Sequence, residues 1–418
     1  MKGWITAMPD LASKERLSKL KTPVTLYYVA FSLYLIEYII GHTTFSELLF
    51  VSVGAFAAVL QAVALVLLVI KFFMQRATPA GWIAAAIIVL VGFVCWRQSS
   101  EGWLFWVALF VVCSDEVRLR PLAAIALAVA TGMFLVVVSC SSLGIIENQV
   151  RTRGNGTVRY ALGFTHPNYV GLMLLVICAS FSALRFGKNP LPDMLLIVAA
   201  DIFNLAFADS RTAVAVSVVQ AALLLVFYCV GGEPARRRTL AAGGVLVMIT
   251  VVLSFFLMVF YDASNPLMSA LNSALSGRLY LANAYYKMQG LTLFGSSYEA
   301  FSPIYWDGGK PYSFVVDNAW CHLLLHYGVI ATALFLLGII ALLKKIVDEV
   351  RWDALTFGLL LMFVYSFTES FGLRFECNYF LFAMGPALIF GLLGNQRKAV
   401  GNLVSELFLA RGSANGKH

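Results

Sequence analysis

Residues 239–261 read TLAAGGVLVMITVVLSFFLMVFY, and the longest polar break in the chain, 262–317, follows directly. The first stretch carries no charge and is long enough to cross a bilayer as a helix, which takes about 20 apolar residues. Comparable runs recur along all 418 residues. The chain is 60% hydrophobic and 12% charged, whereas a water-soluble domain has about 25% charged residues. The sequence therefore predicts an all-α, polytopic integral membrane protein.

Apolar runs predict about twelve transmembrane helices in a single transmembrane domain, 1–418. Strands are not expected, because the runs are continuously apolar rather than alternating. The fourth run is short for a crossing and could be re-entrant. The predicted spans are 24–40, 47–70, 80–96, 102–114, 121–143, 168–186, 191–208, 211–230, 239–261, 318–343, 353–371 and 378–394.

The distribution of basic residues predicts the orientation of these spans. With the N-terminus inside, only nine of the 30 Lys and Arg residues fall outside, namely Arg97, Arg151, Arg153, Arg159, Arg211, Arg278, Lys287, Lys310 and Arg374. Cytoplasmic loops are enriched in Lys and Arg, so both termini are expected in the cytoplasm and the loops 144–168 and 262–317 outside. The net charge of +8 reflects this topology. It does not indicate nucleic-acid binding, because the basic residues are spread over many loops.

Most of the outer cations are arginines, whose planar fork suits phosphate and carboxylate groups. One interpretation is that they bind an anionic substrate. The alternative is that they pair with Asp209, Glu147, Glu376 or lipid head groups.

The sequence predicts no metal and no other cofactor. The seven Cys residues lie in or beside apolar runs and form no CxxC pair, which argues against disulfides and thiolate metal sites. The pair His322 and His326 has a spacing that suits zinc on a helix, but no HExxH motif and no obvious third ligand accompany it.

Two polar motifs stand where predicted spans begin. His166-Pro167-Asn168 is either a helix-start device or a polar substrate contact at the outer surface. Asp209-Ser210-Arg211-Thr212 precedes the eighth span, where Ser or Asp would cap the helix. Arg211 is unfavourable near a helix N-terminus, so it needs an anion, either Asp209 or a ligand phosphate.

Two further motifs lie in the long outer loop and at its end. Arg278 begins a stretch with apolar residues at helical spacing, which predicts an amphipathic helix on the membrane surface. Asp317, Asn318, His322 and His326 open the tenth span, and the last three share one helix face. His322 and His326 are interpreted either as general acid–base groups or as a pair of hydrogen-bonded core histidines.

Acidic residues near outer helix ends complete the set of candidates. Glu37, Glu369 and Glu376 could each pair with an outer arginine. The predicted catalytic residues are Asp317, His322 and His166. The predicted substrate-binding residues are Arg211, Arg278, Arg159, Asn168, Asn318, His326 and Glu369.

The order of these motifs resembles that of the O-antigen polymerase/ligase family of bacterial membrane enzymes. The resemblance covers roughly 144–394 and rests on GFTHPN before one span, SRTA opening a later one, SGR in the long loop, and FG followed by DNAW and HYG. Family ligases carry His-Asn, nine residues, then Gly. Here Asn318 and Gly328 keep that spacing and Asp317 occupies the His position, which favours a polymerase over a ligase.

The resemblance implies an inverting, metal-independent glycosyltransferase at the outer face of the bacterial cytoplasmic membrane. Its substrates would be undecaprenyl-pyrophosphate-linked oligosaccharide repeats, with Arg211 and Arg278 matching the arginines that bind the pyrophosphate. The implied partners are membrane lipids and the flippase and chain-length regulator of the same pathway. The product would be a surface polysaccharide such as O-antigen, capsule or exopolysaccharide.

Three other functions compete with a polymerase. A ligase would transfer a finished glycan to another acceptor with the same donor chemistry. A secondary transporter also has about twelve spans, but no internal repeat is visible. The third is a non-catalytic scaffold for polysaccharide assembly.

Overall fold

The computed structural model describes residues 10–47, 53–75, 77–153, 156–297, 305–307, 310–312 and 316–390. Helices dominate this part of the chain. The long and short α-helices are α1 (Asp10–Gly41), α2 (Val53–Met74), α3 (Pro79–Ser99), α4 (Trp103–Val112), α5 (Leu119–Ser142), α6 (Pro167–Arg185), α7 (Leu191–Phe207), α8 (Arg211–Cys229), α9 (Glu233–Phe260), α10 (Pro266–Ala274), α11 (Arg278–Gln289), α12 (Ala319–Asp348) and α13 (Ala354–Tyr365). Single turns are η1 (Thr44–Glu47), η2 (Ser370–Leu373), η3 (Tyr379–Ala383) and η4 (Pro386–Phe390).

Within the described residues, eight helices are long and apolar enough to cross a membrane: Pro23–Gly41, Gly54–Met74, Pro79–Ser99, Leu119–Ser142, Pro167–Arg185, Arg211–Cys229, Glu233–Phe260 and Ala319–Asp348. Several of them expose large apolar side chains, as lipid contact requires. Val59 is 59% exposed and Leu90 61% exposed. The chain is therefore built as an all-α protein suited to a membrane.

Of the other four predicted spans, 191–208 forms the 17-residue α7, and the remaining three are shorter in the structure than in the sequence pattern. The run 102–114 forms α4, whose 10 residues are all buried. The run 353–371 forms the 12-residue α13 and then η2, and 378–390 forms η3 and η4. A helix that is apolar on every side is one that protein surrounds. Burial inside the bundle explains why these segments are apolar, and the eight long helices do not confirm a count of twelve.

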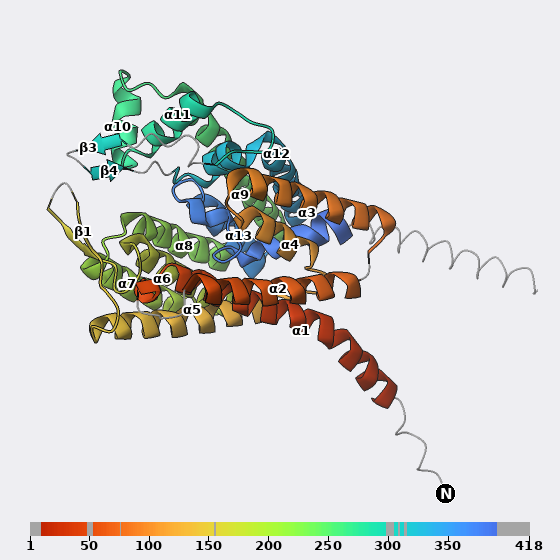
Figure 1. The fold of residues 1–418 in the computed structure, drawn as a ribbon. Helices are drawn as coiled ribbons and strands as arrows, with labels where there is room; N and C mark the ends of the chain where they lie inside the picture. Colours follow the sequence, from red (N-terminus) through yellow and green to blue (C-terminus); the bar gives the residue numbers. More distant parts are fainter. Residues whose placement is uncertain are drawn as a thin grey trace, which may run out of the picture.

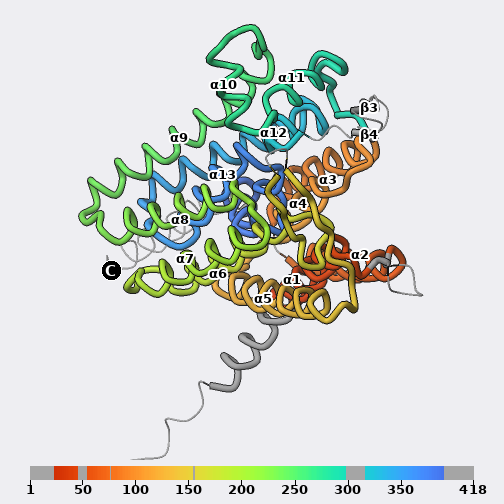
Figure 2. The backbone as a smooth tube through the Cα atoms, turned by 90° about the vertical axis from the view of Figure 1, so that its left-hand side faces the viewer, coloured from red at the N-terminus to blue at the C-terminus, as the bar shows by residue number. Residues whose placement is uncertain are grey.

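The helices form two flanks around the short buried segments. In Figure 1, α1, α2 and α5 lie along one flank and α3, α9 and α12 along the other. Figure 2 shows α10 and α11 together beyond this second flank, where α11 packs on α9 and α12. The predicted helix after Arg278 is α11, and it buries Ala282 and Tyr285 against that bundle.

The strands of the described residues form two hairpins. Both hairpins lie in connecting segments. β1 (Val150–Thr152) pairs antiparallel with β2 (Val158–Tyr160) in the loop 144–168. β3 (Tyr305–Asp307) pairs with β4 (Lys310–Tyr312) in the loop 262–317. The expectation of no strands was therefore wrong for the loops, because polar connecting residues can pair where no lipid surrounds them. Both hairpins lie at the same end of the bundle (Figure 1).

Backbone hydrogen bonds hold the middle of the long loop, at residues 292–296, against α12. Gly328 interrupts α12 with φ 83°, and Gly295 has φ 87°. Val329 N donates to Thr292 O at 2.9 Å and Ser296 N donates to His326 O at 3.2 Å. A Cβ on Gly328 would lie 2.4 Å from Gly295 N. Glycine is therefore required where the FG and HYG motifs meet.

Candidate functional site

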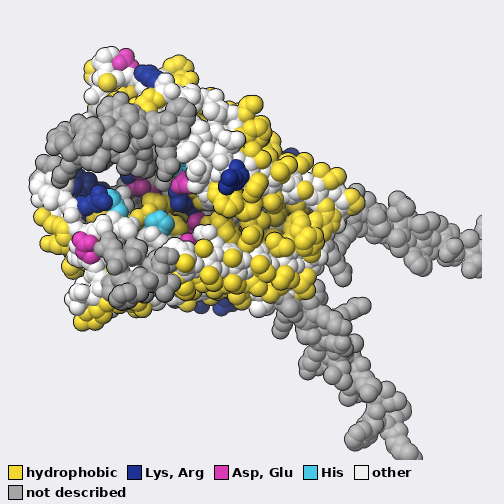
Figure 3. All heavy atoms as spheres, in the orientation of Figure 1, with side chains coloured by type: hydrophobic (Ala, Val, Ile, Leu, Met, Phe, Trp, Pro, Cys, Tyr) yellow, Lys and Arg dark blue, Asp and Glu magenta, His cyan; other side chains and the backbone are white. Residues whose placement is uncertain are grey.

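Charged side chains gather around a hollow at the end of the bundle that carries the hairpins. Figure 3 shows basic, acidic and histidine side chains in this recess, whereas the flank beside it is mostly hydrophobic. Three groups of residues account for the chemistry at this end. We call them the turn cluster (Arg153, Arg159, Asp209 and Arg211), the arginine–carboxylate cluster (Arg278, Asp317 and Glu369) and the glutamate–histidine cluster (Glu101, His322, His326, Tyr327 and Arg374).

The turn cluster surrounds the tight connection between α7 and α8. Asp209 has a positive φ of 42°, and the Asn204 side chain holds Ser210 through both its amide atoms. Asp209 Oδ2 forms an ion pair with Arg153 Nε at 2.8 Å, and Asp209 Oδ1 accepts a hydrogen bond from Arg211 Nε at 3.4 Å. The Arg211 side chain is 61% exposed. Arg211 thus pairs with Asp209, as one of the two interpretations predicted, and most of its side chain remains exposed.

Ser210 stands at the N-cap position of α8, but its side chain makes no capping hydrogen bond. The prediction that the Ser or Asp side chain caps this helix was therefore wrong for Ser210. The Asn204 contacts occupy the Ser210 backbone instead.

His166 and Asn168 are helix-start residues, as one of the two predicted alternatives had it. His166 Nδ1 accepts the Asn168 amide at 3.1 Å at the start of α6. The Asn168 side chain accepts Arg159 Nη2 at 2.6 Å, and Arg159 Nε donates to Ala208 O at 2.8 Å. Burial, together with the charges of Arg151 and Arg159, lowers the pKa of His166 to about 4. His166 is therefore a weak proton acceptor near neutral pH.

Arg278 is the centre of the arginine–carboxylate cluster. Its Nε donates to Asp317 Oδ2 at 2.9 Å, its Nη2 donates to Glu369 Oε1, and its Nη1 donates to Thr212 Oγ1 at 3.3 Å. The Arg278 guanidinium, at the start of α11, thus binds side chains from α8, from the segment before α12 and from the segment before η2. The predicted pairing of Glu369 with an outer arginine is confirmed.

The two carboxylates around Arg278 differ in environment. The Asp317 side chain is 30% exposed and that of Glu369 is 3% exposed. Glu369 lies beyond α13, in the connection to η2. Asp317 is therefore the accessible base and Glu369 the buried partner of Arg278.

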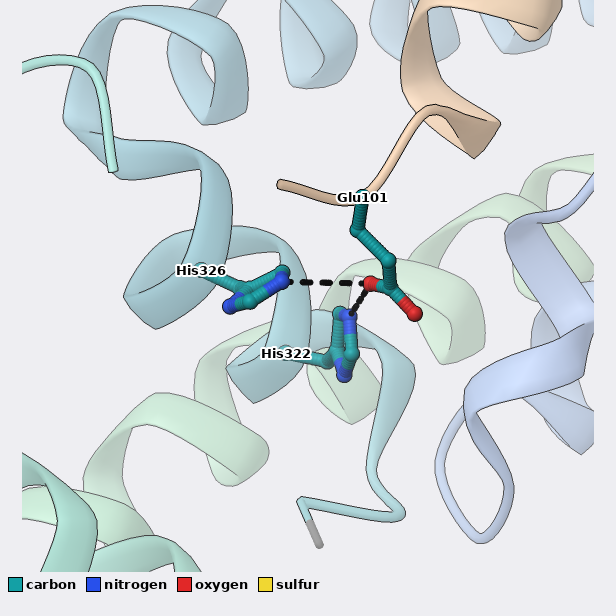
Figure 4. Close-up of side chains that lie close together, drawn as sticks. All are labelled: Glu101, His322 and His326. Carbon is teal, nitrogen blue, oxygen red and sulfur yellow. Dashed lines mark hydrogen bonds and ion pairs between the residues drawn. The ribbon is translucent and has the colours of Figure 1, made fainter. Parts of the chain in front are cut away.

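The glutamate–histidine cluster converges on one carboxylate (Figure 4). Glu101 Oε2 lies 2.9 Å from His322 Nε2 and 3.3 Å from His326 Nε2. Arg374 Nη2 donates to Glu101 Oε1 at 2.9 Å, and the Tyr327 hydroxyl donates to Oε2 at 3.2 Å. Burial alone would raise the pKa of Glu101, but His322 and Arg374 hold it well below its usual range. Glu101 is therefore a permanent anion.

The start of α12 positions the two histidines. Asn318 caps the helix by accepting Trp320 N and Cys321 N, both at 3.0 Å, and its amide donates to Ser254 and Phe367. Asn318 is buried and fully used by these bonds, so its role is to hold the helix. His322 Nδ1 lies 3.3 Å from Val316 O, which places both ring nitrogens of His322 beside acceptors.

One hydrogen bond links two of the clusters. Arg278 Nη1 donates to Oγ1 of Thr212, the residue next to Arg211, at 3.3 Å. The turn cluster and the arginine–carboxylate cluster are therefore neighbours.

The glutamate–histidine cluster has the size of a cation site. The ligating atoms of Glu101, His322 and His326 lie within 4.8 Å of one another, a spacing that a divalent metal could bridge. Arg374 already neutralises Glu101. Two neutral imidazoles and a compensated carboxylate would leave the charge of a dication unbalanced. The geometry therefore fits a hydrogen-bonded ion cluster better than a metal centre.

Sequence reasoning found most of these residues and missed Glu101. The predicted residues Arg159, Asn168, His166 and Arg211 meet in and beside the turn cluster. Glu101 lies 221 positions before its partner His322, so no local spacing relates them. The one available signal was a lone acid between two apolar runs on the outer side.

Comparisons with known proteins identify no relative. A scan against protein-family models, a search of curated proteins and a search of solved structures each gave no match. Function is therefore inferred from the chemistry of the site.

Proposed function

We propose that this chain is a glycosyltransferase of the bacterial cytoplasmic membrane that polymerises undecaprenyl-pyrophosphate-linked oligosaccharide repeats on the outer side. The proposal takes the chain to cross the membrane about twelve times, with the loops 144–168 and 262–317 outside. The observation that carries it is that Arg278 binds Thr212, the residue next to Arg211, at the end of the bundle where charged side chains gather (Figure 3). Arginines placed in this way suit an anionic ligand that arrives within the membrane.

The proposed reaction uses these arginines to stabilise the leaving group. The acceptor hydroxyl oxygen attacks the anomeric carbon of the donor sugar and forms the new glycosidic bond. The bond from that carbon to the phosphate oxygen breaks, and undecaprenyl pyrophosphate leaves with the electron pair. Arg278 and Arg211 supply fixed positive charge where the departing pyrophosphate gains negative charge, in a site of low dielectric constant.

Asp317 is the best candidate for the proton acceptor in this reaction. It is the accessible carboxylate beside Arg278, whereas His166 has a pKa of about 4 and His322 has acceptors beside both ring nitrogens. The proton of the acceptor hydroxyl would pass to Asp317 as the glycosidic bond forms. When pyrophosphate binds, its oxygens would replace Asp317 on the Arg278 fork and free it for this task.

Reconstitution of the purified protein tests the proposal. Proteoliposomes would receive a lipid-linked repeat extracted from a strain that lacks this gene, with a chelator present and without nucleotide sugar. We expect longer lipid-linked oligosaccharides and release of undecaprenyl pyrophosphate. No elongation under these conditions would contradict a polymerase. Transfer of the glycan to a different added acceptor would instead identify a ligase.

A further inference from the structure

Glu101 has the most exposed side chain of the glutamate–histidine cluster. Its side chain is 35% exposed, whereas those of His322 and His326 are 4% and 2% exposed. Arg374 is mostly buried and Tyr327 is fully buried. The cluster is thus arranged with four polar groups behind one carboxylate. A carboxylate supported in this way is positioned to bind a ligand.

The support fixes Glu101 in position as well as in charge. The Tyr327 hydroxyl donates to the Glu101 backbone carbonyl at 3.0 Å, and the Glu101 amide donates to Ser99 Oγ at 3.2 Å. Buried ionisable groups near membrane depth are costly and mark function by default. Four polar side chains directed at one accessible carboxylate are more than the termination of α3 requires. The arrangement is therefore a preorganised acceptor of hydrogen bonds.

The charges around Glu101 select the kind of ligand. An anion would be repelled by the carboxylate, and a cation would meet the guanidinium of Arg374 on its other oxygen. Uncharged hydroxyl groups meet neither obstacle, and a hydrogen bond from a hydroxyl to a carboxylate is among the stronger neutral-ligand contacts. Glu101 therefore suits the hydroxyls of a neutral polyol such as a saccharide.

Two aromatic rings accompany the charged groups of this site. Tyr169 and Phe371 are half-buried, with ring centroids 5.4 Å apart. Tyr169 interacts electrostatically with both Glu101 and Glu369, and Arg374 lies over the Phe371 ring at 5.8 Å. Apolar walls with a few fixed polar groups are typical of small-ligand sites.

We infer that Glu101 and its supporting residues form a saccharide subsite, which binds uncharged sugar hydroxyls and is separate from the arginines that bind the diphosphate. This inference rests on the proposed function and adds to it the place of the sugar. Glu101 would be the sugar-binding residue, with His322, His326, Tyr327 and Arg374 as positioning residues.

Two probes in binding measurements on the full-length protein in detergent test this division. The first is the free oligosaccharide released by mild acid from the lipid-linked repeat, which has no phosphate. The second is farnesyl diphosphate, which has no sugar. We expect Glu101→Gln to weaken oligosaccharide binding about tenfold to a hundredfold, the worth of a hydrogen bond to a charged group, and to leave farnesyl diphosphate binding unchanged. Arg278→Gln is expected to show the opposite pattern.

Several results would overturn the subsite. One is oligosaccharide binding by Glu101→Gln equal to that of the unmodified protein. Another is one equivalent of zinc per chain that is lost in Glu101→Gln, which would identify a cation site. If Glu101→Gln is not monodisperse, Glu101→Asp takes its place, because its shorter side chain withdraws the same carboxylate. Farnesyl diphosphate binding confirms that the Glu101 variants are folded, and oligosaccharide binding confirms it for Arg278→Gln. Failure of polymerisation by the unmodified protein would contradict the proposed function and leave these binding results to decide the subsite.

Discussion

Arg278 and Glu369 are 91 positions apart in the chain and hydrogen-bonded in the structure. Their contact joins the beginning of α11 to the segment after α13, and Asp317 completes it from the beginning of α12. Two carboxylates and a hydroxyl thus fill the guanidinium fork that the proposed reaction offers to pyrophosphate. Carboxylate and phosphate oxygens suit the same fork. The site is therefore assembled before substrate arrives, and exchange of ligands on Arg278 would be the first step of catalysis.

Gly328→Ala is expected to destabilise the fold. Its positive φ and the Gly295 amide 2.4 Å from the added Cβ impose strain of about 1–3 kcal/mol before any clash is relieved. Gly132→Ala is the matched control, because its Cβ would meet nothing within 4 Å on α5, and alanine favours a helix. Melting temperatures of the two variants decide the matter. Equal melting temperatures would show that the backbone contact between the loop and α12 is not as described.

Asp317→Asn tests the identity of the proton acceptor. The amide keeps the shape of the side chain and cannot take a proton, so the turnover number is expected to fall about 10²–10⁴-fold with little change in KM. His166→Gln is the comparison, and a small effect is expected because the His166 pKa of about 4 makes it a weak base. A larger loss of turnover in His166→Gln than in Asp317→Asn would reverse the roles.

The orientation of the bundle can be read by chemical labelling of cysteines. Ser264 is exposed in the loop 262–317, and Arg237 is exposed near the start of α9. In a Cys229→Ser background, Ser264→Cys is expected to react with a membrane-impermeant maleimide in intact spheroplasts. Arg237→Cys is expected to react only after permeabilisation, because cytoplasmic loops are rich in basic residues. The reverse pattern would place the arginine clusters on the wrong side for the proposed reaction.

The sequence predicted the long helices, but its count of about twelve crossings is not confirmed by the eight helices that are long and apolar enough within the described residues. Lipid-facing helices and helices buried inside the bundle are equally apolar, so 102–114 and 353–371 have the composition of crossings. The structure makes them α4 and α13, with 10 and 12 residues. Hairpins were missed because short pairings in polar loops have no apolar period for a pattern to detect.

The candidate site could be predicted where function follows from local sequence. Arg278, Arg211 and the residues that open α12 lie at helix starts. A charged residue at such a position can be recognised from the sequence alone. Partnerships were not visible in the same way. Arg278 with Glu369, and Glu101 with His322, join segments 91 and 221 positions apart. Only tertiary packing decides such pairs, and that is why Glu101 was overlooked.

The most direct test of the central claim is the polymerisation rate of Arg278→Lys in proteoliposomes. Lysine keeps the positive charge but loses the fork that contacts three acceptors at once. We expect the rate to fall about 10²–10³-fold, as when a group that stabilises developing charge is removed. Arg237→Lys, a change at an exposed arginine far from the hollow, is expected to leave the rate unchanged. Equal rates for Arg278→Lys and the unmodified protein, at equal expression, would contradict the claim that this guanidinium grips the departing diphosphate.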